Sequence, residues 1–285
     1  MHKMPSGRFI FFYDFFPKKI LIIISILLFS SFCSANQLSI MTWNAGDSDR
    51  TPPNIDEIYE LVSKAPKKPD ILILQEIFFN NFKGLKERLN FTNSIHSSQI
   101  STKILNLGIL SSCEISKSEL IVFSNKISGA LKAEINHNGQ AINIYCVHFE
   151  YIRKKTRDKN GYVDLKFNEI FNILKKEVYL QNPRKNEANK LLEIAGKPGK
   201  ATILAGDFNT ISFSSSIKNI KKYYNDSMPF FKSFVSGTYK KIHFPIKPRI
   251  DYIFHSPDLK VKSFKIIRQT PGDHFPVIAD ISIKT

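Results

Sequence analysis

Thr202-Ile-Leu-Ala-Gly-Asp-Phe-Asn209 is an apolar run that ends abruptly in an acid and an amide. Its first residues predict a buried β-strand, and Gly-Asp-x-Asn is good turn chemistry. The same change from apolar to polar recurs at the ends of residues 71–76 and 142–148. A side chain at such a point is held by a rigid scaffold yet reaches solvent. The pattern therefore predicts an α/β protein with its functional site at the ends of several strands.

The rest of the chain follows the same alternation of short apolar runs and amphipathic stretches. Asn136-His-Asn-Gly139 is a hairpin signal. Helices are expected after a cap at Asn54, from about residue 165, and over residues 184–195 with Gly196 at the C-terminal end. The inward face of the second helix is expected to carry Phe167, Ile170, Phe171, Leu174 and Val178. Further strands are expected at residues 38–44, 107–111, 120–123, 130–135, 141–149, 250–255, 261–267 and 276–283. These elements indicate layered, largely antiparallel or mixed sheets.

The first 35 residues have the layout of a secretory signal peptide. Four basic residues and one acid precede the apolar run at residues 20–29, and Cys33-Ser-Ala35 fits a small-x-small cleavage pattern before Asn36. The run is short for a membrane span of roughly 20 residues. An uncleaved anchor is the alternative, because the aromatic residues 9–16 lengthen the apolar region. We expect a leader at 1–35, a folded domain at 36–285, and a secreted or periplasmic product.

Composition and charge narrow the function. The 285 residues are 42% hydrophobic and 23% charged, which excludes a disordered or fibrous chain. The formal charge is +16, of which the leader holds +3, so +13 remains after cleavage. This surplus favours polyanionic partners such as nucleic acid or phospholipid headgroups, although a lysine-rich proteome would give the same number.

Cleavage would leave two cysteines, Cys113 and Cys146. They could pair in an oxidising compartment, or remain as two buried thiols. The chain has no CxxC and no HExxH, so nothing in it resembles a zinc site.

Eight acids, amides and histidines fall where strands become loops. Each has an ordinary explanation when taken alone, such as a helix cap, a turn or a core histidine. Together they supply oxygen ligands for a hard cation and two imidazoles for proton transfer. The positions are Asn44, Glu76, His148, Asp207 with Asn209, Asp251, and Asp273 with His274.

The order of these segments resembles the endonuclease/exonuclease/phosphatase superfamily of metal-dependent phosphoesterases. The matching stretches are Met41-Thr-Trp-Asn44, Leu74-Gln-Glu76, Val147-His-Phe149, Leu204-Ala-Gly-Asp-Phe-Asn209, Arg249-Ile-Asp-Tyr-Ile-Phe254 and Gly272-Asp-His-Phe-Pro-Val277. Gly272 is a departure, since the family usually has serine there. The resemblance implies a four-layered α/β sandwich, with two mixed, mostly antiparallel sheets face to face and helices outside.

The resemblance also implies roles for individual residues. Glu76, with Asn44 and Asp273 nearby, would hold a divalent cation. Oxygen-only ligands favour Mg²⁺, with Mn²⁺ possible. Asp207 would orient or deprotonate water, Asn209 would bind the phosphate, and His274 would contact it while paired with Asp251. His148 would act on the leaving-group side.

Substrate choice must come from residues outside these motifs. Basic and aromatic residues follow His148, and Arg153, Lys155 and Arg249 are the expected substrate contacts. A second basic group, Lys218, Lys221 and Lys222 beside Tyr223 and Tyr224, is expected on the same side. The leading hypothesis is a secreted metal-dependent nuclease that cuts DNA, as a monomer without an obligate protein partner. The alternatives are a phosphoesterase for sphingomyelin or inositol phosphates, and an inactive relative that only binds.

Overall fold

The computed structural model describes residues 37–46, 54–102, 105–123, 127–151, 158, 160–163, 167–179, 183–196, 199–229, 236–243, 245 and 247–283. The chain divides into two units, Met1–Gln37 and Leu38–Thr285, and the second carries everything below. The expected leader lies outside the described residues. No helix within the described ranges is both long and apolar enough to cross a membrane.

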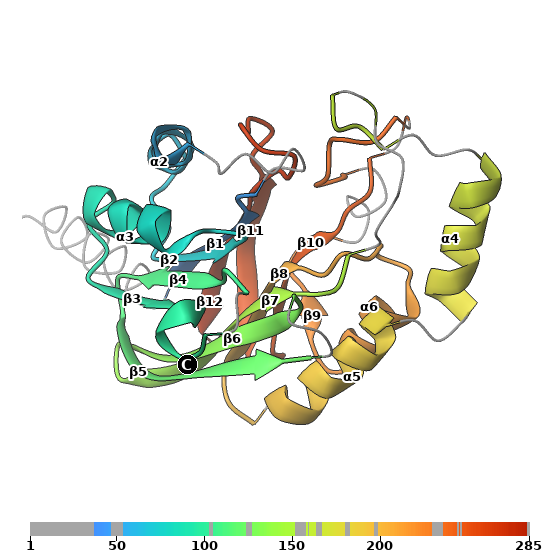
Figure 1. Cartoon of the computed structure of the whole chain (residues 1–285). Helices are drawn as coiled ribbons and strands as arrows, with labels where there is room; N and C mark the ends of the chain where they lie inside the picture. The colour runs from blue at the N-terminus through green and yellow to red at the C-terminus, as the bar shows by residue number, and fades with distance from the viewer. Residues whose placement is uncertain are drawn as a thin grey trace, which may run out of the picture. The chain divides into compact units, whose positions relative to one another are not determined.

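Two six-stranded sheets form the centre of the second unit (Figure 1). The first has the order β11 (Leu259–Ile266), β12 (Val277–Ile283), β1 (Gln37–Asn44), β2 (Ile71–Gln75), β4 (Gly108–Ser111) and β3 (Asn93–His96). The second has the order β5 (Glu114–Val122), β6 (Gly129–His137), β7 (Gln140–His148), β8 (Thr202–Asp207), β10 (Asp251–His255) and β9 (Asn225–Asp226). The β1–β2 and β7–β8 pairs are parallel, and seven other pairs are antiparallel.

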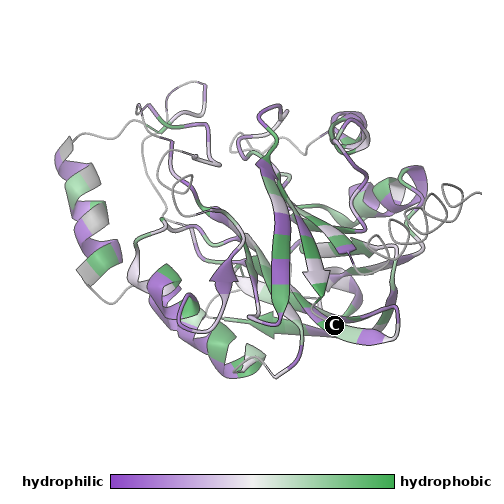
Figure 2. Cartoon of the chain, turned by 180° about the vertical axis from the view of Figure 1, so that it is seen from behind, coloured by the Kyte–Doolittle hydropathy of each residue, from purple (hydrophilic) through white to green (hydrophobic). Residues whose placement is uncertain are grey.

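Three apolar clusters define four layers. Alternate residues of both sheets, among them Ile40 and Ile144, fill the space between the sheets. Helices α2 (Ile55–Ser63) and α3 (Phe79–Arg88) cover the outer face of the first sheet. Helices α5 (Pro183–Ala195) and α6 (Ser215–Ile220) cover the second. Figure 2 shows apolar and polar bands along the strands, whose successive side chains point to opposite faces of each sheet. The expected four-layered α/β sandwich is confirmed.

Local signals in the sequence explain several element ends. The Asn54 side chain accepts a hydrogen bond from the Asp56 amide and caps α2. Asn138 (φ 54°) and Gly139 (φ 81°) take left-handed conformations between β6 and β7, as a tight hairpin turn requires. Gly196 (φ 72°) ends α5 with its amide bonded to the Leu192 carbonyl.

Other features differ from expectation. Helix α4 (Phe167–Tyr179) is present, but Phe171 is 62% exposed, so its predicted inward orientation is wrong. Helices α3 and α6, the 3₁₀ turn η1 (Ser97–Gln99) and strands β3 and β9 were not predicted. Both cysteines in the described part are free thiols, with Cys146 buried and Cys113 half-buried.

Candidate active site

Strand register brings three of the predicted residues together. His148 ends β7 and pairs with Asp207, which ends the parallel strand β8. The first residue of β10, Asp251, pairs with Asp207 from the other side. The carboxyl ends of parallel neighbours lie at one edge of a sheet, so the register alone places an imidazole and two carboxylates side by side.

Asn44 links this group to the first sheet. It ends β1 and lies opposite Gln75, the last residue of the parallel strand β2. Its Nδ2 donates to Glu76 Oε1 at 3.0 Å and to Asp207 Oδ2 at 3.1 Å, while its Oδ1 accepts from the Gly46 amide. One amide thus joins carboxylates from both sheets, which fixes Glu76 beside the residues of the second sheet.

The turn after β8 presents Asp207 and Asn209 as a pair. The Asn209 amide donates to Asp207 Oδ1 at 2.8 Å, and Asn209 Nδ2 donates to Asp207 Oδ2 at 3.1 Å. Asn209 (φ 49°) and Glu76 (φ 56°) both have left-handed backbones. Such conformations cost free energy in non-glycine residues and cluster at functional sites. Position 206 (φ 148°) requires glycine, because a Cβ there would lie 1.9 Å from the Val147 carbonyl oxygen.

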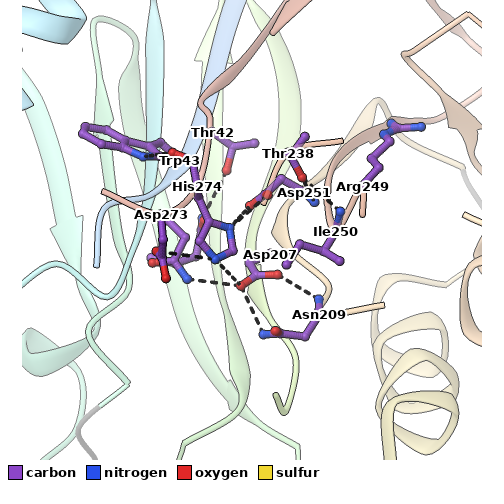
Figure 3. A network of polar contacts seen from close by, with 12 residues as sticks. Thr42, Trp43, Asp207, Asn209, Thr238, Arg249, Ile250, Asp251, Asp273 and His274 are labelled. Atoms are coloured by element: carbon purple, nitrogen blue, oxygen red, sulfur yellow. Dashed lines mark hydrogen bonds and ion pairs between the residues drawn. The ribbon is translucent and has the colours of Figure 1, made fainter. Parts of the chain in front are cut away.

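His274 forms the other side of the cluster (Figure 3). Its Nδ1 is 3.0 Å from Asp251 Oδ2, and its Nε2 is 3.8 Å from Asp207 Oδ2. Trp43 Nε1 donates to the His274 carbonyl at 3.1 Å, and the Asp251 amide donates to Thr238 Oγ1 at 3.0 Å. His274 is therefore held through both its backbone carbonyl and its imidazole ring.

Burial and neighbouring charges shift the pKa values of His274 and Asp207. Burial acts to lower the pKa of His274, but the carboxylates of Asp251, Asp207 and Asp273 outweigh it and hold that pKa well above its ordinary value. The three carboxylates therefore favour the imidazolium form of His274. Burial is the largest cause that raises the pKa of Asp207, to about 6, and the nearby Asp251 carboxylate acts in the same direction.

His148 lies across from His274. Its Nε2 is 3.5 Å from Glu76 Oε1 and 3.8 Å from Asp207 Oδ2. The side chain is 8% exposed, and neither ring nitrogen has a hydrogen-bond partner among the described residues. A buried imidazole without a hydrogen-bond partner is unusual in a folded protein, and it marks His148 as a candidate functional residue.

The donors fit a hard divalent cation. Asp207, Asp251 and His274 offer ligand atoms within 4.8 Å of one another. His274 is a poor ligand, however, because its Nδ1 is bound to Asp251 and the surrounding carboxylates favour its imidazolium form. Glu76, whose side chain is 44% exposed, offers oxygens beside Asn44, and the buried Asp273 offers an oxygen 4.0 Å from His274 Nε2. Oxygen ligands of this type suit Mg²⁺ or Mn²⁺ better than zinc.

Of the three predicted substrate contacts, only Arg249 lies within the described residues. Arg153 and Lys155 lie outside the described residues. Arg249 is buried, and its guanidinium makes two hydrogen bonds to Asp226, at 2.8 and 2.7 Å. Its side chain points away from His274 in Figure 3. The structure thus places Arg249 in an ion pair inside the protein, which replaces the expected contact with substrate.

The second basic group, which includes Lys222, Tyr223 and Tyr224, does not lie beside the site. Tyr224 is buried, and its hydroxyl donates to the Gly196 carbonyl. Gly196 precedes β8, whereas the catalytic candidate Asp207 ends β8. Lys222 and Tyr223 share a surface hollow with Gly196. These residues therefore lie toward the opposite end of the strand, and the expectation that they flank the site is wrong.

Some residues around the site escaped sequence reasoning. The Thr238 hydroxyl accepts hydrogen bonds from the Ile250 and Asp251 amides. The Tyr239 ring packs edge-on against His274, with ring centroids 5.1 Å apart. Thr238 and Tyr239 lie in an irregular segment without a sequence motif. The isolated antiparallel β-bridge between Tyr239 and His274 shows that this segment lies beside the site.

Comparison with known proteins identifies the family and the fold of the chain. The model of the Endonuclease/Exonuclease/phosphatase family matches residues 41–274, and no curated protein matches the chain. Solved structures share the fold at low identity. An endonuclease/exonuclease/phosphatase from Bacteroides vulgatus has 18% identity and a TM-score of 0.62, covering 87% of this chain and 99% of its own.

Two further structures are equally similar. D. rerio TDP2 complexed with single strand DNA product has 19% identity and a TM-score of 0.64, covering 86% of this chain and 99% of its own. A mannosyl-6-phosphatase from Bacteroides thetaiotaomicron has 18% identity and a TM-score of 0.63, covering 86% and 100%. Members of the matched family are phosphoester hydrolases and generally depend on divalent metals. The family match spans most of the sequence, and the chain belongs to the endonuclease/exonuclease/phosphatase family.

Proposed function

We propose that this protein is a divalent-metal-dependent phosphodiesterase that hydrolyses nucleic acid, with DNA as the favoured substrate. The observation that carries the proposal is the meeting of Asp207 with two imidazoles. His148 Nε2 and His274 Nε2 each lie 3.8 Å from Asp207 Oδ2. This arrangement can activate a nucleophile, neutralise a phosphate and serve a leaving oxygen in one place.

The side chains divide these tasks by position. Asp207 is the acceptor that orients and deprotonates water, and Asn209, the candidate phosphate contact, fixes that carboxylate through its backbone amide and its Nδ2. His274 is held by Asp251 and places positive charge at the phosphate. His148, with both ring nitrogens unpaired among the described residues, donates to the leaving oxygen.

Glu76, Asn44 and Asp273 would hold the divalent cation, Mg²⁺ in our proposal, with Mn²⁺ as a substitute. A cation there supplies positive charge that stabilises the transition state of an already anionic diester. The protein's own contribution is to fix these oxygens. Asn44 bonds Glu76 directly, and a Cβ on Gly46 would lie 2.1 Å from Glu76 Oε2.

Two considerations support nucleic acid as the substrate. The net charge of +13 that remains without residues 1–35 favours a polyanion with many phosphates over a small ester. Arg153 and Lys155, which follow the strand of His148, remain our candidates for phosphate contacts. TDP2, which shares the fold, is described with a single strand DNA product. We further propose that residues 1–35 direct export and that the mature protein acts as a monomer outside the cytoplasm.

A substrate panel tests the proposal. The protein without residues 1–35 is incubated with plasmid DNA, RNA, sphingomyelin, phosphoinositides and mannose 6-phosphate, with Mg²⁺ or with chelator. We expect nicking of the plasmid that stops with chelator and resumes when Mg²⁺ is restored. Release of phosphate or phosphocholine without DNA cleavage would replace the nuclease assignment. An Asp207→Ala protein is the control for contaminating nuclease.

A further inference from the structure

Two loops carry the catalytic candidates of the second sheet, and both are held from behind by helices. The loop after β7 follows His148, and the loop after β8 contains Asn209. Direct contacts between them are the Phe149 amide bonded to the Asp207 carbonyl and Asn209 Nδ2 bonded to the Phe149 carbonyl. These bonds join the loops to each other and to the end of β8, and the Phe208 amide bonds the Ile250 carbonyl before β10. The helices hold the two loops at further points.

Buried side chains of α5 bind the first loop. Glu187 Oε2 accepts a hydrogen bond of 2.9 Å from the Glu150 amide. Arg184 donates from a terminal guanidinium nitrogen to the Glu150 carbonyl at 3.2 Å. Both main-chain polar groups of Glu150, two residues after His148, are thus bound by charged side chains. Glu187 is bound in turn by the buried hydroxyl of Ser128 at 2.5 Å.

A buried side chain of α4 binds the second loop. Glu177 Oε2 accepts a hydrogen bond from Thr210 Oγ1 at 2.5 Å. Thr210 directly follows Asn209, and its carbonyl accepts from the Tyr252 hydroxyl at 3.0 Å. The other oxygen of Glu177 pairs with the Arg184 guanidinium. Arg184 therefore connects the helix contacts of the two loops into one chain of bonds.

Stability alone is a weak reason for this arrangement. The side chains of Arg184 and Glu177 are 7% and 3% exposed, and Glu187 is also buried. Removing charges from water costs free energy, and apolar residues of similar size often support the fold as well as a buried ion pair. Charged groups do offer directional bonds, and here those bonds end on the backbone of Glu150 and the hydroxyl of Thr210.

We propose that Glu177, Arg184 and Glu187 form a loop clamp that positions His148 and Asn209 relative to each other. They are positioning residues and do not touch the substrate. The proposal rests on the proposed function for its catalytic consequence. A displacement of about 1 Å in a catalytic group can lower the rate about 100-fold, so loosening either loop lowers kcat more than KM.

The test compares Thr210→Val, which removes the hydroxyl at constant shape, with Thr210→Ser, which keeps it. Glu193→Gln, an exposed change on α5, is the control. The substrate is bis(4-nitrophenyl) phosphate with Mg²⁺. We expect Thr210→Val to lower kcat about 10- to 100-fold with little change in KM, and Thr210→Ser to recover most of the rate. A double variant, Glu177→Leu with Arg184→Met, should stay folded and show the same loss of kcat.

Hydrogen exchange gives a readout that needs no activity. In Thr210→Val, Arg184 can turn fully to Glu177 and leave the Glu150 carbonyl. Peptides from both loops, residues 147–151 and 207–211, should then exchange on the order of tenfold faster. Faster exchange near residue 210 alone, or unchanged kcat in an active protein, would overturn the clamp. If the wild-type protein hydrolyses no phosphodiester, the proposed function fails, and the exchange in both loops still decides whether the clamp exists.

Discussion

The hydrogen bond between His274 Nδ1 and the Asp251 carboxylate sets the orientation of the imidazole. Among the described residues, no other side chain bonds this nitrogen. With Asp251 on Nδ1, Nε2 faces Asp207 at 3.8 Å. Asp251→Asn keeps the shape but removes the charge that favours the imidazolium. We expect kcat to fall about 10²- to 10⁴-fold, the range for losing a positioned acid or base. Far-ultraviolet circular dichroism should be unchanged. Asp258→Asn, an exposed aspartate on a turn, is the control. A loss within twofold for Asp251→Asn would contradict the role of this pair.

Gly46 tests the position of Glu76. A Cβ at Gly46 would lie 2.1 Å from Glu76 Oε2, so Gly46→Ala must displace that carboxylate. We expect a higher Mg²⁺ concentration for half-maximal activity, because the displaced oxygen no longer meets the other ligands. Gly199→Ala is the matched control, since a Cβ there meets nothing within 4 Å. The measurement is a Mg²⁺ titration of the initial rate, and identical curves for both variants would remove Glu76 from the metal site.

The Arg249–Asp226 pair joins β9 to the segment before β10. Burial would raise the pKa of Asp226, but hydrogen bonds and charge from Arg249, together with Lys221, hold it below its ordinary value. A carboxyl with a lowered pKa in the folded state adds stability above its unfolded pKa and loses it as the pH falls through the folded value.

Asp226→Asn should therefore lower the free energy of unfolding at pH 7 by about 3–5 kcal/mol, because Arg249 is left as an unpaired buried charge. Below about pH 4, where the wild-type protein begins to lose this contribution, the two proteins should converge. Urea unfolding between pH 3 and pH 7 measures the difference. Asp258→Asn again serves as an exposed control. A constant difference over the whole range would show that protonation of Asp226 does not govern acid stability.

The strand ends could be predicted from the sequence. An apolar run indicates a buried strand, and an acid or histidine directly after it indicates the point where that strand reaches the surface. Glu76, His148 and Asp207 were found in this way. Charge in helices carries no such information. Glu177 and Arg184 resemble any solvated helix residues, and only the structure shows them buried. Arg249 was misinterpreted for the same reason, since its basic character suggested phosphate while Asp226, distant in sequence, is its partner.

The site exists only where the two sheets meet. Asn44 of the first sheet bonds Asp207 of the second, and Trp43 bonds the carbonyl of His274. These pairs are separated by 163 and 231 residues. No local segment contains the chemistry, so activity should disappear with the packing of the sheets. The positive net charge, by contrast, is a property of the whole molecule.

That charge leads to a prediction about salt. The affinity for DNA should fall as salt rises, because each phosphate contact releases counterions. Asp207→Ala, which we expect to bind DNA without cutting it, allows the measurement with fluorescent oligonucleotides. For about five contacts, the slope of log K against log salt is about −4.5 for duplexes and about −3.5 for single strands. A slope near zero would exclude a phosphate track.

Paired charge changes show where that track runs. Arg153→Gln with Lys155→Gln removes two charges that follow the strand of His148. Lys218→Gln with Lys222→Gln removes two from α6 and the turn after it, toward the other end of β8. Both pairs lower the net charge equally, so a long-range field would respond equally to either. If the track adjoins the active site, only the first pair should make the duplex slope shallower, by about 1.8. Equal changes would mean that the charge acts at a distance and that Arg153 and Lys155 are not substrate contacts.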